Sequence, residues 1–246
     1  MKNRLDQLVL QHGLAPTLTK AQALIAAGQV LVNDQPADKA GSLFAADSRL
    51  RLRGKTTCPY VSRGGLKLAA GLKHFHLDPA GFICADVGAS TGGFTDCLLQ
   101  LGAAKVYAID VGYGQLAWKL RQDPRVVVME RTNARNLHSG DLAEPLDLAV
   151  IDASFISLKT LLPPLLLLFS KTIRVLALIK PQFEVGKGQL GTGGVVRDSD
   201  LHEQVIAEIE NFAGELGLAP QGVCPSPILG PKGNREFLIY LVSETG

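Results

Sequence analysis

Hydrophobic and polar positions follow two different rhythms, and the change between them divides the chain. Over 5–25 apolar residues recur at helical spacing, and Val30–Val32 is a short apolar run that follows them. Over Arg49–Arg53 leucine alternates with arginine, which is typical of a half-buried strand. The pattern predicts two short helices followed by short strands, a small α+β domain over 1–54. Few apolar residues follow, which predicts a linker over 55–61.

From Phe82 onward the rhythm is that of alternating strands and helices. Five short, continuous apolar runs are separated by helical patterns, which predicts a parallel sheet covered on both faces. A helix is predicted over 200–216, with Asp200 and Glu203 as its capping box, and an antiparallel strand pair over 223–229 and 236–241. The prediction is therefore α/β: a mostly parallel, seven-stranded sheet in a second domain over 62–246.

Charged residues end all five apolar runs. In open α/β sheets, ligands bind outside the carboxyl ends of the strands, where loops and helix N-termini converge. One such charge is commonly a helix cap, whereas five at the same edge indicate the rim of an active site. The five residues are Asp86, Asp110, Glu130, Asp152 and Lys180.

A glycine-rich turn, 86–94, follows the first run and opens a helix. It lacks the Gly-Lys-Ser/Thr ending of a phosphate-binding loop and the Gly-x-Gly-x-x-Gly dinucleotide pattern. Its leading carboxylate could face the cationic end of S-adenosylmethionine, and Asp110 could accept two hydrogen bonds from the ribose hydroxyls. A tight strand–helix turn of any α/β protein is the alternative. The candidate cofactor residues are Asp86, Gly88, Ser90, Thr91, Gly92, Gly93, Phe94 and Asp110.

Two lysines and two carboxylates are expected to converge above the sheet. Asp152 and Lys180 end adjacent strands, Lys67 precedes the first strand, and Glu236 opens the last one. Methyl transfer to a ribose hydroxyl needs a base, and desolvation beside a second ammonium favours a neutral lysine. We assign Lys180 as the base and Lys67 as the group that orients the 2′-hydroxyl. Either lysine alone could be a solvated surface residue, so the hypothesis depends on the set.

The net charge of +2 hides an asymmetry. Residues 1–75 hold eleven Lys/Arg and four Asp/Glu, a net of +7, so the remainder sums to −5. A basic segment on a near-neutral body is typical of a phosphate-binding module, although a solvated lysine-rich surface is the alternative. The four cysteines lack metal or disulfide spacing, and no apolar run approaches the roughly 20 residues of a membrane span. We expect a cytoplasmic monomer without a metal.

Seven stretches of the sequence closely resemble the TlyA family, whose members are called hemolysins but act as ribosomal RNA 2′-O-ribose methyltransferases. The stretches are 60–67, 86–94, 110–118, 130–135, 152–158, 180–186 and 233–237. The resemblance implies a Rossmann-like methyltransferase domain that uses S-adenosylmethionine. It also implies further cofactor residues and a Lys-Asp-Lys-Glu catalytic tetrad. The added cofactor residues are Val111, Asn133 and Asp152, and the tetrad is Lys67, Asp152, Lys180 and Glu236.

The same resemblance implies a cytidine of ribosomal RNA, in a ribosomal subunit, as the substrate. The N-terminal module looks like the RNA-binding domain named after small-subunit ribosomal protein four. Thr17-Leu18-Thr19-Lys20 departs from the usual Ser-Arg before Lys-Ala, so we expect no RNA contact from Leu18. The chain looks like the shorter family type, which modifies large-subunit 23S rRNA, whereas longer members also modify 16S rRNA. The RNA-binding candidates are Arg4, Lys20, Arg49, Arg51, Arg53 and Arg63.

Three other functions are open at this stage. A non-catalytic ribosome-binding or assembly factor would use the basic module but leaves Asp86, Asp110 and the tetrad unexplained. A secreted cytolysin is suggested only by the family's other name, and the sequence opens with no export signal. A small-molecule methyltransferase would leave the charge of +7 unexplained.

Overall fold

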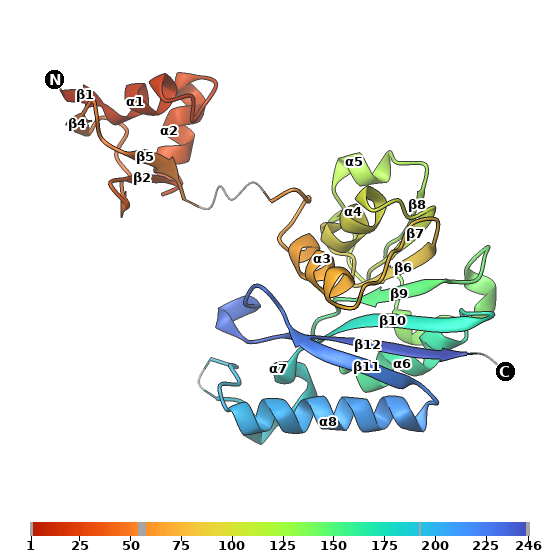
Figure 1. Ribbon diagram of the computed structural model, residues 1–246. Coiled ribbons are helices and arrows are strands. Elements are labelled where there is room, and N and C mark those ends of the chain that lie inside the picture. Colours follow the sequence, from red (N-terminus) through yellow and green to blue (C-terminus); the bar gives the residue numbers. More distant parts are fainter. Residues whose placement is uncertain (1, 54–57, 192, 245–246) are drawn as a thin grey trace. The chain divides into compact units, whose positions relative to one another are not determined.

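The computed structural model describes residues 2–53, 58–191 and 193–244 (Figure 1). The chain forms two compact units, Met1–Cys58 and Pro59–Gly246. Of the linker expected over 55–61, residues 55–57 lie outside the described part of the chain.

The first unit is a small α+β fold around one apolar cluster. Its two helices contribute Leu5, Val9 and Ile25 to this cluster, and the strands contribute Val30 and Leu52. The arginines that alternate with the leucines of β5 are exposed, as the sequence pattern predicts. The elements are β1 (Lys2–Arg4), α1 (Leu5–Gln11), α2 (Leu18–Ala26), β2 (Val30–Val32), β3 (Gln35–Pro36), β4 (Leu43–Ala45) and β5 (Leu50–Leu52).

The second unit is built on one seven-stranded sheet, in the order β11-β12-β10-β9-β6-β7-β8. The five strands from β6 to β10 are parallel, and β12 is antiparallel to both β10 and β11. This is the predicted fold class. The strands are β6 (Ile83–Val87), β7 (Lys105–Ile109), β8 (Val126–Met129), β9 (Leu148–Ile151), β10 (Thr172–Ile179), β11 (Ala219–Pro225) and β12 (Phe237–Glu244).

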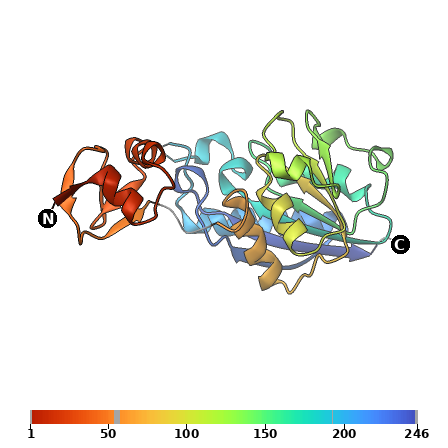
Figure 2. The ribbon, with the colours of Figure 1, turned by 90° about the horizontal axis from the view of Figure 1, so that it is seen from above.

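Helices cover both faces of this sheet, because strands with apolar side chains on both sides must be shielded from water on both faces. On one face, α3, α4 and α5 bury Leu68, Leu98 and Leu120, and on the other α6 and α8 bury Leu162 and Ile209 (Figures 1 and 2). The helices are α3 (Gly64–His74), α4 (Gly93–Gln100), α5 (Trp118–Arg121), α6 (Leu158–Leu166), α7 (Pro181–Glu184) and α8 (Ser199–Glu215).

Several predicted boundaries are wrong, among them the start of β11, which is Ala219 instead of residue 223. The helix predicted over 200–216 begins one residue earlier, because the side chain of Asp198 accepts a hydrogen bond from the Asp200 amide at 3.0 Å and caps it. The capping box of Asp200 and Glu203 is therefore not used. The strand predicted over 223–229 ends at Pro225, since the chain then reaches Pro227, which has no N–H to donate to a ladder.

Candidate active site

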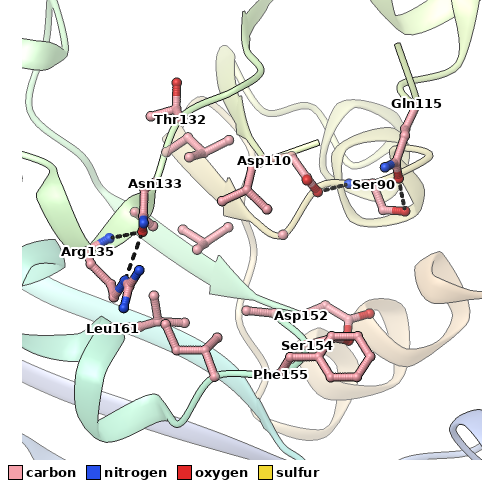
Figure 3. Close-up of a pocket in the computed structure, with 17 residues that line it drawn as sticks. Ser90, Asp110, Gln115, Thr132, Asn133, Arg135, Asp152, Ser154, Phe155 and Leu161 are labelled. Atoms are coloured by element: carbon pink, nitrogen blue, oxygen red, sulfur yellow. Dashed lines mark hydrogen bonds between the residues drawn. The ribbon is translucent and has the colours of Figure 1, made fainter. Parts of the chain in front are cut away.

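Two pockets open side by side at the carboxyl ends of the parallel strands. The first has a volume of about 540 Å³ and the second of about 520 Å³. Volumes of this size suit a nucleoside-sized ligand. Figure 3 shows the first pocket. The residues that line both pockets are Gly88, Ser90, Asp152 and Ser154. A group bound in one pocket can therefore reach a group bound in the other.

Asp110 follows β7 and lines the first pocket. Its carboxylate accepts hydrogen bonds from the backbone amides of Ser90 and Gly112, both at 2.7 Å (Figure 3). Each carboxylate oxygen keeps further acceptor capacity, because an ionised carboxylate has about four lone-pair sites. Asp110 is thus held in place and can still accept hydrogen bonds from two neighbouring hydroxyls.

The lining of the first pocket also includes the polar Asn133 and several apolar side chains. The side-chain oxygen of Asn133 accepts hydrogen bonds from the Arg135 amide at 3.1 Å and from Arg135 Nε at 3.2 Å. The apolar side chains suit the faces of a planar base. They are Val87, Ile109, Val111, Ala134, Ile156 and Leu161. A carboxylate that can accept from two hydroxyls, in a pocket with apolar side chains, fits an adenosyl ligand.

Asp86 does not lie where the sequence predicts. It sits inside β6 instead of at its end, is fully buried, and lines neither of the two described pockets. One of its oxygens accepts hydrogen bonds from the Thr95 amide at 2.9 Å and the Thr95 hydroxyl at 2.6 Å. Burial raises the pKa of this carboxyl to about 7. Asp86 therefore supports the start of α4 from behind the glycine-rich turn.

The glycine-rich turn allows two close backbone approaches. Gly88 has φ of +86°, and a Cβ there would lie 2.9 Å from Ala153 Cα. A Cβ on Gly93 would collide with Ser62 Oγ and lie 2.9 Å from the Gly65 amide nitrogen. The ends of β6 and β9, and the first turns of α3 and α4, can therefore come together only because these side chains are absent.

The predicted cofactor residues divide into three groups. The first pocket is lined by Gly88, Ser90, Asp110, Val111, Asn133 and Asp152. Three others line only the second pocket: Thr91, Gly93 and Phe94. Two line neither pocket: Asp86 and Gly92. Gly92 faces Leu120, with which a Cβ would collide, so its role is in packing α5 against the turn.

The four predicted tetrad residues form one connected cluster. Lys67 Nζ lies 2.6 Å from Glu236 Oε2 and 3.7 Å from Asp152 Oδ2, and Lys180 Nζ lies 2.6 Å from Asp152 Oδ1. Lys67, Lys180 and Glu236 are buried, so their charges must be paired, as they are here. Asp152 thus bridges two buried lysines that come from different ends of the domain.

This cluster forms one wall of the second pocket. Lys67, Asp152 and Lys180 line it, together with the glycine-rich turn and the segment 228–231. Glu236 lies behind Gly230, where a Cβ would collide with Glu236 Oε1. A glycine is therefore needed at position 230 for the carboxylate to reach Lys67.

Sequence reasoning misplaced two rim charges, Asp86 and Glu130, and missed several pocket residues, among them Ser154. Glu130 contacts Arg121 and lines neither described pocket, so the rim is formed by Asp110, Asp152 and Lys180. Ser154 lines both pockets, and its Oγ accepts a hydrogen bond from Lys180 Nζ at 3.0 Å. Its position two residues after a strand-ending aspartate was the available signal.

Two of the RNA-binding candidates of the first unit, Arg4 and Arg51, are hydrogen-bonded to carboxylates of that unit. Arg4 donates two hydrogen bonds to the buried Asp6, at 3.1 and 2.8 Å, and the guanidinium lowers the pKa of that carboxyl to about 2. Arg51 Nε lies 2.6 Å from Asp34 Oδ1. These two arginines therefore also serve the fold of the unit. The remaining candidates, all exposed, are Lys20, Arg49, Arg53 and Arg63. Arg63 belongs to the second unit and lines the second pocket.

The described residues offer neither a metal site nor a membrane-spanning helix. They contain no group of histidine, cysteine and acidic side chains that could hold a metal ion. Within the same ranges, no helix is both long enough and apolar enough to cross a bilayer.

Comparisons with known proteins identify similar chains for both units. The family model of FtsJ-like methyltransferases matches residues 60–243, and the S4 domain model matches 3–47. The 16S/23S rRNA (cytidine-2′-O)-methyltransferase TlyA of Mycobacterium tuberculosis is 47% identical over 98% of this chain and 90% of its own length. The 23S rRNA (cytidine-2′-O)-methyltransferase TlyA of Campylobacter jejuni is 36% identical over 75% of this chain and 72% of its own. A solved Streptococcus thermophilus structure, titled as a hemolysin, superposes with a TM-score of 0.77, at 44% identity over 98% of this chain and 88% of that one.

Proposed function

We propose that this chain, which belongs to the TlyA family of FtsJ-like methyltransferases, methylates the 2′-hydroxyl of a cytidine in ribosomal RNA. The methyl donor is S-adenosylmethionine. The observation that carries the proposal is the contact of two pockets at Asp152. One pocket fits an adenosyl group, and the other is lined by a buried cluster of two lysines and a carboxylate.

S-adenosylmethionine supplies an activated methyl group on its sulfonium, so the protein's tasks are binding, in-line positioning and removal of one proton. Asp110 holds the ribose of the donor, and the apolar side chains of the first pocket hold its adenine. Lys180 takes the proton of the substrate hydroxyl, and Lys67 orients that hydroxyl. Glu236 and Asp152 keep the two lysines in place at 2.6 Å each. The reaction needs no Lewis acid, and we propose no metal.

The substrate assignment draws on both units. S4 domains are RNA-binding modules, and the first unit exposes Lys20, Arg49 and Arg53. Arg63 adds a positive charge to the pocket that would receive the target nucleoside. Because relatives act on 16S/23S or 23S rRNA, we propose 23S rRNA as the principal target and 16S rRNA as the second. The protein would act as a monomer in the cytoplasm, where ribosomal subunits are found.

Mapping of ribose methylation tests this assignment directly. Ribosomal RNA from cells with and without the protein is compared nucleotide by nucleotide, and we expect one cytidine of 23S rRNA to lose its 2′-O-methyl group. The purified protein should then transfer labelled methyl groups to large subunits from the deficient cells. Identical methylation maps would refute the proposal.

Lys180→Ala tests the assignment of the base. Loss of a general base lowers rates by about 10²–10⁴-fold, so methyl transfer should fall by at least about a hundredfold. Binding of S-adenosylmethionine, measured by calorimetry, should persist, because Lys180 lines only the second pocket. Lys73→Ala, on the exposed side of α3, is the matched control and should behave as the native protein. Near-native turnover of Lys180→Ala would remove Lys180 from this role.

A further inference from the structure

Lys180 Nζ faces three oxygens within the described chain. Asp152 Oδ1 lies at 2.6 Å, the Asp152 carbonyl oxygen at 3.2 Å and Ser154 Oγ at 3.0 Å. Lys180 is buried, whereas Ser154 is exposed to both pockets (Figure 3). The serine hydroxyl therefore lies beside the buried amine, and both border the pocket that a substrate would occupy.

The chemistry of the three oxygens differs. An ammonium has three hydrogens, and each of these oxygens can accept one. A neutral amine keeps two hydrogens and gains a lone pair, which must face a donor. The carboxylate and carbonyl oxygens of Asp152 only accept, whereas the hydroxyl of Ser154 can also donate. Of these three partners, only the Ser154 hydroxyl can donate a hydrogen bond to the lone pair of a neutral Lys180.

We propose that Ser154 relays the proton of the ribose 2′-hydroxyl to Lys180, an inference that rests on the proposed function. The 2′-oxygen forms its bond to the methyl carbon as the carbon–sulfur bond breaks, and that electron pair stays on sulfur. The 2′-hydroxyl proton passes to Ser154 Oγ, while the hydroxyl proton of Ser154 passes to Lys180 Nζ. The positive charge of the sulfonium is thereby replaced by that of the Lys180 ammonium, so atoms and charge balance.

Residues before and after Ser154 make contacts that hold its segment in place. A relay requires this, because the distance between hydroxyl and amine must stay constant. Before Ser154, Asp152 contacts Lys180. After it, the Phe155 ring lies 5.0 Å from that of Phe183, and Ser157 Oγ donates to Glu184 at 2.5 Å. Phe183 and Glu184 belong to α7, which follows Lys180 directly. The hydroxyl and the amine are thus held by the same two segments, so their separation is preorganised.

Ser154→Ala and Ser154→Thr, made in the full chain, test the relay. A water molecule can partly replace a lost hydroxyl, so the single-turnover rate of Ser154→Ala should fall by about 10- to 100-fold, less than the full contribution of a general base. Threonine keeps the hydroxyl and should restore most of the rate. The KM for rRNA and the affinity for S-adenosylmethionine by calorimetry should change far less than the rate, although Ser154 lines both pockets. Ser199→Ala, at the exposed start of α8, is the control.

Two further measurements separate a relay from a structural role. In mixtures of light and heavy water, the single-turnover rate should fall non-linearly with the deuterium fraction, because two protons move in the same step. Transfer of a single proton would give a straight line. In the free protein, NMR should show slow exchange of the Lys180 ammonium hydrogens with water, and Ser154→Ala should speed this exchange by releasing one of them.

Each contrary result identifies what has failed. If the native protein methylates rRNA but Ser154→Ala is equally fast, or Ser154→Thr is as slow as Ser154→Ala, the relay is wrong and the proposed function stands. Lost cofactor binding in Ser154→Ala, or unchanged ammonium exchange, would likewise overturn the relay. If the native protein does not methylate rRNA, the proposed function fails and the relay fails with it.

Discussion

The role of a side chain in this sheet depends on its exact position along the strand. A residue at the strand end can line a pocket, whereas its neighbour inside the strand lies in the core. Asp86 was expected at the end of β6, but the strand continues to Val87 and leaves the carboxyl inside it. Successive side chains of a strand point to opposite faces, so one residue of error moves a side chain from the pocket to the core. Sequence patterns locate strands well and their last residues poorly. The sequence pattern could therefore not predict that Asp86 is buried.

The buried Asp86 should make stability depend on pH. Its pKa is about 7 in the folded chain and near 3.8 when unfolded, so the folded state holds a proton that the unfolded state has released. The stabilisation is complete below pH 4 and is lost as the pH rises through 7. One proton corresponds to about 1.4 kcal/mol per pH unit.

The measurement is the free energy of unfolding of the second unit, by denaturant titration at several pH values between 5 and 8. The native protein should lose stability with rising pH more steeply than Asp86→Asn, which has no such proton to release. Asp200→Asn, on the exposed surface of α8, should keep the native slope. Parallel curves for the native protein and Asp86→Asn would contradict this linkage.

Chemistry made the tetrad predictable although its members are far apart in sequence. Lys67 and Glu236 are 169 positions apart and lie 2.6 Å from each other. Asp152 and Lys180 could be noticed because they end apolar runs, whereas Lys67 lies in the helix before the first strand and Glu236 directly before the last one. Ser154 has no charge and interrupts no pattern, so its contact with Lys180 could be found only in three dimensions.

At the scale of elements, the site depends on two helices that meet at their first turns. α3 carries Lys67, and α4 begins at the glycine-rich turn. Their backbones touch because Gly93 presents no side chain to Ser62 and Gly65. The contact fixes the height of Lys67 above the sheet. Helical periodicity predicts such helices but says nothing of how closely they approach, because the approach depends on residues that lack side chains.

Gly93→Ala should therefore damage catalysis more than folding. The new Cβ would lie 2.9 Å from the Gly65 amide nitrogen and push the first turn of α3 away, and with it Lys67. Overpacking of this kind costs about 1–3 kcal/mol of stability. A displacement of about 1 Å can lower a rate about a hundredfold. Single-turnover rates and unfolding free energies of the same variant give the comparison.

Gly214→Ala is the control, since a Cβ there would meet nothing within 4 Å. It should leave the rate unchanged and, in an exposed helix, slightly stabilise the fold. A native rate in Gly93→Ala would show that the approach of α3 to α4 does not set the position of Lys67.

At the scale of the whole molecule, charge is distributed unevenly. Residues 1–75 carry a net charge of +7, and the rest of the chain carries −5. This separation was visible in the sequence, as was the alternation that exposes the arginines of β5. The sequence did not show that Asp34 lies beside that row, with Arg51 at 2.6 Å and Arg49 at 3.9 Å. Part of the positive field is therefore neutralised within the unit.

Replacing Arg49, Arg51 and Arg53 together with alanine should weaken binding to rRNA and flatten its dependence on salt. Each lost phosphate contact lowers the slope of log affinity against log salt by about 0.7–0.9. Because Asp34 already pairs with two of these arginines, we expect a total change smaller than three full contacts would give. Binding is measured at several salt concentrations, with Lys159→Ala on α6 as the control. An unchanged slope would place the RNA surface elsewhere.

The wall that the two pockets share also has a pharmacological consequence. Gly88, Ser90, Asp152 and Ser154 border both spaces, so the two pockets adjoin. A single compound that joins an adenosyl moiety to a cytidine through its 2′-oxygen would occupy both at once. The tether makes the second binding event intramolecular, so such a bisubstrate inhibitor should bind far more tightly than either half alone.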